Sequence, residues 1–153
     1  MPNHSEHRKL LYSADQMYQL VADVGKYPEF LPWCSAARIR SREIEDDCEI
    51  MLADLVISFK VFRERFGSQV RLHPLERKIE TEYLDGPFKF LKSSWKFTVI
   101  NETECEVDFF VNFEFKSRVL QGIIGVVFSE AMHRIVRAFE KRADDLYGKH
   151  LVK

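Results

Sequence analysis

The side chains that most often carry catalysis or bind metals are scattered along this chain of 153 residues. The sequence contains no HExxH or GxSxG motif and no closely spaced set of Cys and His residues, which are patterns of zinc enzymes and serine hydrolases. His4 and His7 lie in an N-terminus that we expect to be frayed. His133 has Glu130 and Arg137 about one helical turn to either side, which is typical of a solvated helix face. The sequence therefore predicts no catalytic residue and no metal site, and it favours a protein that is not an enzyme.

The three cysteines, Cys34, Cys48 and Cys105, are too few and too far apart for a disulfide framework or a CxxC metal knuckle. Cys34 would be reactive only with a depressed pKa, so we expect a small buried apolar residue there. The first residues are polar, unlike a signal peptide, and the longest apolar stretch, 119–128, is about half of a membrane span. We predict a cytoplasmic protein, with peripheral contact to the inner membrane left open.

One carboxylate stands out by its position. Glu64 shares strand parity with Phe62 and Phe66, so simple alternation places it on an apolar face. A buried carboxyl has a raised pKa and could act as an acid or hold a ligand hydroxyl. Gly67 in the same strand could mark a bulge that reverses this facing. Both orientations of Glu64 stay open.

The composition indicates a folded chain rich in aromatic side chains. Hydrophobic residues make up 46% and charged residues 31% of the sequence, and there are 13 Phe. This predicts one domain over 1–153, with its core at about 6–148, in which rings line a core or a cavity. The net charge of −1 excludes a whole-molecule field that attracts nucleic acid, although a local basic patch remains possible.

The hydropathy pattern alternates with period two through the middle of the chain and with helical period near both ends. Because the connections between successive strands are short, neighbouring strands must pair antiparallel. We expect helices at 14–24 and 117–147, and strands at 6–12, 37–44, 49–58, 61–72, 78–84, 91–100 and 104–116.

The second expected helix is long enough to cover the sheet, at about 45 Å for 1.5 Å per residue. Gly122 and Gly125 lie inside it and are unfavourable there; they could permit a kink, a close approach to a ligand, or close packing on the sheet. The predicted fold is α+β, in the order β-α-β(6)-α. A curved antiparallel seven-stranded sheet wraps around the long C-terminal helix.

Four segments in order resemble the coenzyme Q-binding START-domain family, a polyketide cyclase/dehydrase-like group. They are VADVGKYPEFLPWC at 21–34, DGPFK at 85–89 with WKF at 95–97, VNFEFKS at 111–117, and AFEKRA at 138–143. The resemblance extends over about 8–148. It implies the helix-grip (START/Bet v 1-like) fold. It also implies binding of ubiquinone or a related polyprenyl lipid between sheet and helix, by a quinone carrier or chaperone that supports respiratory electron transport, without a covalent cofactor.

The inward-facing residues could form either a packed core or the lining of such a cavity. The residue pattern alone favours a packed core, whereas the resemblance favours a cavity for a hydrophobic small molecule. Hydrogen bonds to a head group could come from Tyr83, Thr81, Ser93 or Glu64. The predicted ligand-binding residues are Trp33, Ile79, Tyr83, Trp95, Phe97, Phe109, Phe113, Ile124, Phe128, Met132 and Ile135.

Two other functions remain open. Bacterial members of the same family are called ribosome-association toxins, which implies an inhibitor of subunit joining from a toxin–antitoxin pair. That function needs an exposed basic surface, for which the C-terminal helix offers candidates interspersed with acids. The basic candidates for that surface are Arg134, Arg137, Lys141, Arg142 and Lys149.

A cyclase-like enzyme is the other alternative. It would need an acid inside the cavity, and Glu64 is the candidate.

Two expected turns, 30–33 and 88–92, combine aromatic or apolar residues, the second with lysines. Such turns could enter a membrane interface and let a quinone pass. They could equally close the ends of the core.

Overall fold

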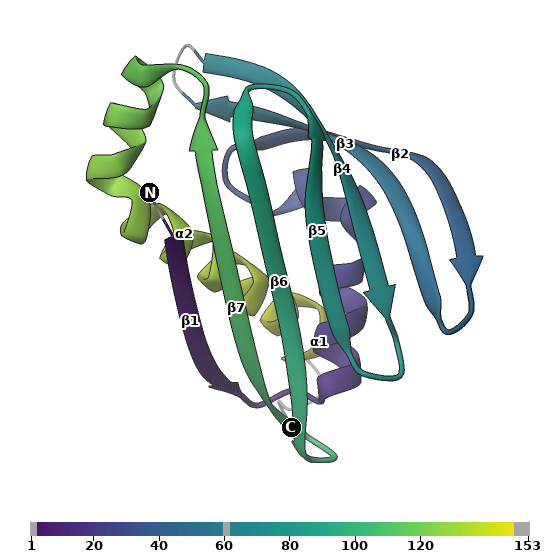
Figure 1. Ribbon diagram of the computed structural model, residues 1–153. Coiled ribbons are helices and arrows are strands. Elements are labelled where there is room, and N and C mark those ends of the chain that lie inside the picture. Colours follow the sequence, from purple (N-terminus) through teal and green to yellow (C-terminus); the bar gives the residue numbers. More distant parts are fainter. Residues whose placement is uncertain (1–2, 60–61, 149–153) are drawn as a thin grey trace.

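A seven-stranded antiparallel sheet curves around two helices in the computed structural model, which describes residues 3–59 and 62–148 (Figure 1). The strand order is β1-β7-β6-β5-β4-β3-β2, and both helices lie on the same face of the sheet. The predicted α+β class and the predicted sheet are confirmed. The elements are β1 (Asn3–Leu10), α1 (Ala14–Ala22), the 3₁₀ helix η1 (Val24–Glu29), β2 (Cys34–Glu45), β3 (Cys48–Phe59), β4 (Phe62–His73), β5 (Lys78–Asp85), β6 (Phe88–Asn101), β7 (Glu104–Phe115) and α2 (Arg118–Tyr147).

The strand β1 begins earlier than the sequence predicted. It pairs with β7 from Asn3, opposite Asn112, to Leu10, opposite Cys105. The expectation of a frayed segment around His4 is therefore wrong, because the backbone of this segment completes one edge of the sheet. The predicted strand start at 61 lies outside the described residues.

The helix α1 begins with a reciprocal cap. The Ser13 hydroxyl accepts a hydrogen bond from the Gln16 amide, and the Gln16 side chain accepts one from the Ser13 amide. Met17 and Val21 are almost fully buried, and the ring of Tyr18 meets Phe97 of β6 edge-on. One end of the inner sheet face is thus covered by α1.

The helix α2 is bent by 70° between its segments Arg118–Val126 and Phe128–Tyr147. The second segment packs on the sheet and buries Phe139 and Ala143. The first segment lies beside the end of β7 instead of crossing the sheet (Figure 1). The prediction that the whole helix covers the sheet is therefore wrong for its first two turns. Gly122 and Gly125, which are unfavourable in a helix interior, lie just before the bend.

The glycines in this first segment have open space around them. A Cβ added to Gly122 or Gly125 would meet nothing within 4 Å outside the helix's own backbone, so close packing on the sheet is excluded for both. Of the helices in the described parts of the chain, none is by itself long and apolar enough to cross a membrane, and the two segments of α2 meet those criteria only when taken together.

Candidate ligand-binding cavity

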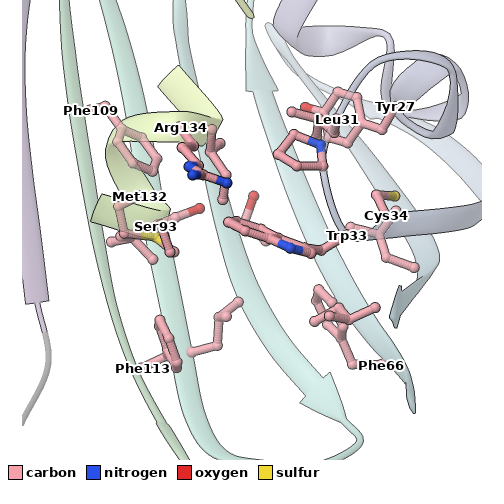
Figure 2. Close-up of a pocket in the computed structure, with 18 of the residues that line it drawn as sticks. Tyr27, Leu31, Trp33, Cys34, Phe66, Ser93, Phe109, Phe113, Met132 and Arg134 are labelled. Carbon is pink, nitrogen blue, oxygen red and sulfur yellow. The ribbon is translucent and has the colours of Figure 1, made fainter. Parts of the chain in front are cut away.

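A cavity of about 440 Å³ lies between the sheet, α2 and the segment before β2 (Figure 2). Its volume falls in the range of roughly 300–1,000 Å³ that is usual for small-molecule sites. Figure 2 shows Leu31 and Trp33 on the side opposite Phe109 and Met132. Most of the side chains that line it are apolar: Tyr27, Leu31, Pro32, Trp33, Cys34, Leu55, Ile57, Phe66, Phe88, Leu91, Trp95, Phe109, Val111, Phe113, Phe115, Ile124, Ala131, Met132, Ile135 and Phe139.

Most of the residues predicted to bind a ligand lie around this cavity. They come from the segment before β2, from β6 and β7, and from α2, so the fold brings together residues that are up to about a hundred positions apart in sequence. Their contact with a ligand remains a prediction. The predicted residues that line the cavity are Trp33, Trp95, Phe109, Phe113, Ile124, Met132 and Ile135.

Four predicted residues lie elsewhere. Ile79 and Phe97 are each 2% exposed and lie in the part of the inner sheet face that α1 covers. The prediction had assigned the cover of the whole inner face to α2 alone. Phe128 is buried beside the ring of Phe113. Tyr83 packs on Phe88, and its hydroxyl accepts a hydrogen bond from the Phe88 amide at 3.1 Å.

The prediction missed the contribution of β3. Leu55 and Ile57 line the cavity, and they lie on the same face as Met51 and Ala53, which are 1% exposed or less. The alternation along 51–57 could have identified this face. The contributions of Phe66 and Phe88, whose rings meet edge-on at 5.3 Å, depend on tertiary packing.

Trp33 projects toward the centre of the cavity (Figure 2) from an unusual backbone conformation. Its φ of 66° is uncommon for a bulky residue and costs roughly 1–2 kcal/mol. The Trp33 carbonyl accepts a hydrogen bond from the Ser58 amide at 2.8 Å, which holds this conformation. Next to it, Cys34 is half-buried and not fully buried as expected. Burial raises the pKa of its thiol, although a weak bond to the Ala36 carbonyl lowers it.

Few polar groups line the cavity. Glu130 and Arg134 lie at its exposed edge, where Nε of Arg134 is 3.4 Å from a Glu130 carboxylate oxygen. Thr81 of β5 and Ser93 of β6 lie on its sheet wall and are directly paired across the two strands. The cavity therefore combines apolar walls, one pair of hydroxyls and one exposed ion pair.

Glu64 is not the buried acid that alternation allowed. It pairs with Ile57 across β3 and β4, but it is exposed and does not line the cavity. Gly67 does mark an irregularity, a register shift between β4 and β5 at Gly67 and Ser68. The cyclase-like alternative thereby loses its candidate acid. Within residues 3–59 and 62–148 no cluster of three or more His, Cys, Asp or Glu could hold a metal ion.

Two polar clusters tie α2 to its surroundings on either side of the cavity. In the first, Glu6 of β1 lies 2.8 Å from His4, 2.9 Å from Arg8 and 3.2 Å from His133 of α2, and Arg8 also pairs with Glu140 at 2.9 Å. Burial raises the pKa of the Glu6 carboxyl, but hydrogen bonds from His4 and Arg8 and the charge of His133 outweigh burial and lower it overall. His133 is thus not simply a solvated residue.

In the second cluster, Arg142 of α2 donates to Glu29 at 2.7 Å and lies 5.0 Å from the centre of the Phe30 ring. The hydrogen bond from Arg142 lowers the pKa of Glu29. Phe30 and Tyr27 also meet Phe139 of α2 edge-on, at 5.2 and 5.4 Å. This cluster fixes the segment that carries Leu31 and Trp33.

The two aromatic turns differ from one another. Phe88 is 2% exposed and stacks on Phe115 at 4.7 Å, so this turn closes the end of the core and does not present its first ring to a membrane. The residues 30–33 are half-buried and lie against the cavity.

The comparisons with known proteins agree on one family. Residues 10–140 match the family described as polyketide cyclase / dehydrase and lipid transport. A protein of Rickettsia prowazekii called ribosome association toxin RatA is 37% identical over 92% of this chain and 96% of its own length, and further bacterial relatives have the same name.

Two further similarities extend this comparison. A Xenopus laevis protein called mitochondrial coenzyme Q-binding protein COQ10 homolog B is 34% identical over 97% of this chain, which spans 61% of that protein. The solution structure of the 18 kDa protein CC1736 from Caulobacter crescentus is similar with a TM-score of 0.79 and 32% identity, over 97% of this chain and 99% of the other.

Proposed function

The chain belongs to the polyketide cyclase / dehydrase and lipid transport family, and on that premise we propose that it binds a polyprenyl quinone or a related lipid in its cavity. The observation that carries this proposal is a cavity of about 440 Å³ with almost entirely apolar walls. Each buried methylene of a hydrocarbon chain contributes about 0.8 kcal/mol without needing a polar partner. The name of the coenzyme Q-binding relative supports a quinone as the ligand.

The chain's own residues suit binding better than a reaction. The cavity wall contains hydroxyls and rings. The acid at its edge, Glu130, is exposed and paired with Arg134, and Glu64, the acid that a cyclase-like mechanism would use, lies in solvent. The names of the relatives describe ribosome association and coenzyme Q binding, not a reaction. The proposed role is a carrier or chaperone of the quinone that supports respiratory electron transport.

Delivery of such a ligand requires contact with a bilayer. Val119, Ile123 and Val126 of the first α2 segment are 76%, 48% and 85% exposed, and Ile124 between them lines the cavity. Exposed apolar side chains beside a lipid cavity suit peripheral contact with a membrane. Replacing the three residues with Ser should reduce flotation of the protein with phospholipid vesicles, while leaving its melting temperature almost unchanged.

The test of the ligand is native mass spectrometry of protein from its own host, with lipid extraction, followed by titration with a decyl ubiquinone. Quenching of tryptophan fluorescence reports binding, because both tryptophans of the sequence line the cavity. Ile57→Phe adds bulk to the cavity wall and should weaken binding; Val56→Phe, on the other face of β3, is the matched control. Protein that neither carries a lipid nor responds to the quinone would exclude the proposal.

Ribosome association is the second candidate function. More of the relatives are named for ribosome association than for coenzyme Q binding. Most of the basic side chains on α2 that could contact a ribosome are paired with carboxylates. Arg134 and Arg137 both face Glu130, at 3.4 and 3.5 Å, and Arg142 is engaged with Glu29. Lys141 lies 3.8 Å from Asp145, and Lys149 lies outside the described residues.

Sedimentation of ribosomal subunits with the purified protein tests this second function. If α2 provides the surface, replacing both Arg134 and Arg137 with Glu should restore subunit joining, whereas Lys96→Glu on the outer sheet face should not. A profile unaffected by the wild-type protein would exclude ribosome association. The same protein preparations can be tested for quinone, so that the two functions are assessed independently.

A further inference from the structure

Two hydroxyl groups form the only polar part of the cavity's sheet wall among the described residues. Thr81 and Ser93 face each other across β5 and β6, so their Cβ atoms lie about 4.5–5.5 Å apart. Their neighbours along the same row of the sheet are Val70 on β4 and Val111 on β7. The pair is therefore a small polar area bounded by apolar side chains.

Neither hydroxyl is used by the protein itself. Within the part of the chain that the structure describes, Thr81 and Ser93 have no hydrogen-bond partner. By contrast, the buried hydroxyl of Ser68 donates to the Ala53 carbonyl at 3.4 Å. A polar group in an apolar site is unfavourable unless it is paired. Once an apolar ligand excludes water from the cavity, the hydroxyls of Thr81 and Ser93 therefore need a partner on that ligand.

The other candidates for a polar contact are less suitable. The Tyr83 hydroxyl accepts from the Phe88 amide, and Glu64 is exposed. Arg134 is 59% exposed and is paired with Glu130. A head group held by Arg134 at the edge of the cavity would leave a hydrocarbon chain against Thr81 and Ser93, with both hydroxyls unpaired.

We propose that Thr81 and Ser93 together bind the oxygen-bearing ring of the ligand, with the ring against the sheet wall and the chain leading out past Ile124 and Trp33. This inference rests on the proposed binding of a quinone-class lipid. A hydroxyl both donates and accepts, so the pair can donate to the carbonyls of an oxidised quinone and accept from the hydroxyls of its reduced form. The volume of about 440 Å³ accommodates a ring and the beginning of a chain, and leaves a long chain partly outside.

The test compares two probes that differ in oxygen content, namely decyl ubiquinone and decylbenzene, by isothermal titration calorimetry. The variant Thr81→Val with Ser93→Ala removes both hydroxyls with little change in shape. The matched control, Thr98→Val with Ser94→Ala, removes two hydroxyls from the outer face of β6, the strand that carries Ser93. Melting temperatures of both double variants establish that they fold.

We expect the cavity double variant to bind decyl ubiquinone about tenfold more weakly, because each hydrogen bond contributes a factor of about two to ten. Its affinity for decylbenzene should stay the same, and the control should match the wild type with both probes. Equal changes for the two probes, or an unchanged affinity for the quinone, would overturn the assignment. A loss caused by Arg134→Gln but not by the cavity double variant would place the ring at the cavity edge instead.

The outcome also separates this inference from the proposed function. Wild-type protein that binds both probes equally well has a lipid cavity that does not recognise oxygen, which overturns the role of Thr81 and Ser93 only. Wild-type protein that binds neither probe overturns lipid binding itself, and the hydroxyl assignment with it.

Discussion

The inner face of the sheet is built in two different ways along its strands. At the end covered by α1, side chains such as Phe97, Met51 and Cys105 are 2% exposed or less. At the other end, the sheet, α2 and the segment before β2 enclose a cavity, and two polar clusters around Glu6 and Arg142 hold its sides. The comparison indicates that the packed end provides stability, whereas the open end leaves the space that the proposed ligand would occupy.

The largest expected difference between the two ends is in how much the free energy of unfolding falls when a side chain is truncated. Met51 and Leu55 lie on the same face of β3, the first packed and the second on the cavity. Met51→Ala should lower the free energy of unfolding by about 2–5 kcal/mol, because it leaves a void in a filled core. Leu55→Ala should cost less than half as much, because it enlarges an existing space. Urea unfolding of both variants measures this, and equal losses would contradict the distinction.

The cluster around Glu6 should make the open end sensitive to acid. Because the pKa of Glu6 is lowered in the folded protein, its stabilising effect is complete above the ordinary carboxyl pKa and is lost as the pH falls through the folded value. Glu6→Gln should cost about 1 kcal/mol near neutral pH, since it removes the carboxylate that contacts His4 and His133 and one of the two carboxylates that pair with Arg8.

Unfolding of wild type and Glu6→Gln over a pH series measures this effect. The difference between the two proteins should shrink toward acid pH. Lys9→Gln at the same strand, where Lys9 is 3.7 Å from Glu104 on the exposed face, is a control that should change little. A Glu6→Gln cost that is independent of pH would argue against the charge network.

Arg142 should govern how firmly the Trp33 segment closes the open end. Arg142→Met removes the bond to Glu29 and the contact with the Phe30 ring, the latter worth about 0.5–1 kcal/mol. In a Trp95→Phe background, acrylamide should then quench Trp33 more strongly. Lys141→Met, on the neighbouring exposed position, should leave quenching unchanged; similar quenching in both variants would show that Arg142 does not hold the segment.

The smallest expected effect concerns thiol reactivity. Cys34 lines the cavity, whereas Cys105 is 0% exposed at the packed end, where burial raises its pKa to about 11. Iodoacetamide should modify Cys34 slowly at neutral pH and faster as the pH rises, because only the thiolate reacts. Decyl ubiquinone should slow the reaction of Cys34 further. Peptide mass spectrometry distinguishes the sites, and modification of Cys105 before unfolding would contradict a filled packed end.

The alternation of apolar residues was sufficient to predict the antiparallel sheet and the inward faces of β6 and β7. The family resemblance, now confirmed over residues 10–140, predicted the cavity. The alternation pattern alone favoured a packed core. Trp33, Trp95 and Met132 were expected around a ligand and do line the cavity. Ile79 and Phe97 have the same pattern and the same facing, but they lie under α1.

The sequence by itself determined which side chains face inward, because alternation and helical period depend only on local backbone geometry. Only the tertiary structure decided which inward residues are packed and which border a cavity, because that depends on where α1 and the two segments of α2 meet the sheet. The tertiary structure also decided that Glu64 is exposed, and that Thr81 and Ser93 lie opposite each other on β5 and β6. These outcomes follow from contacts between residues far apart in the chain, which no local pattern contains.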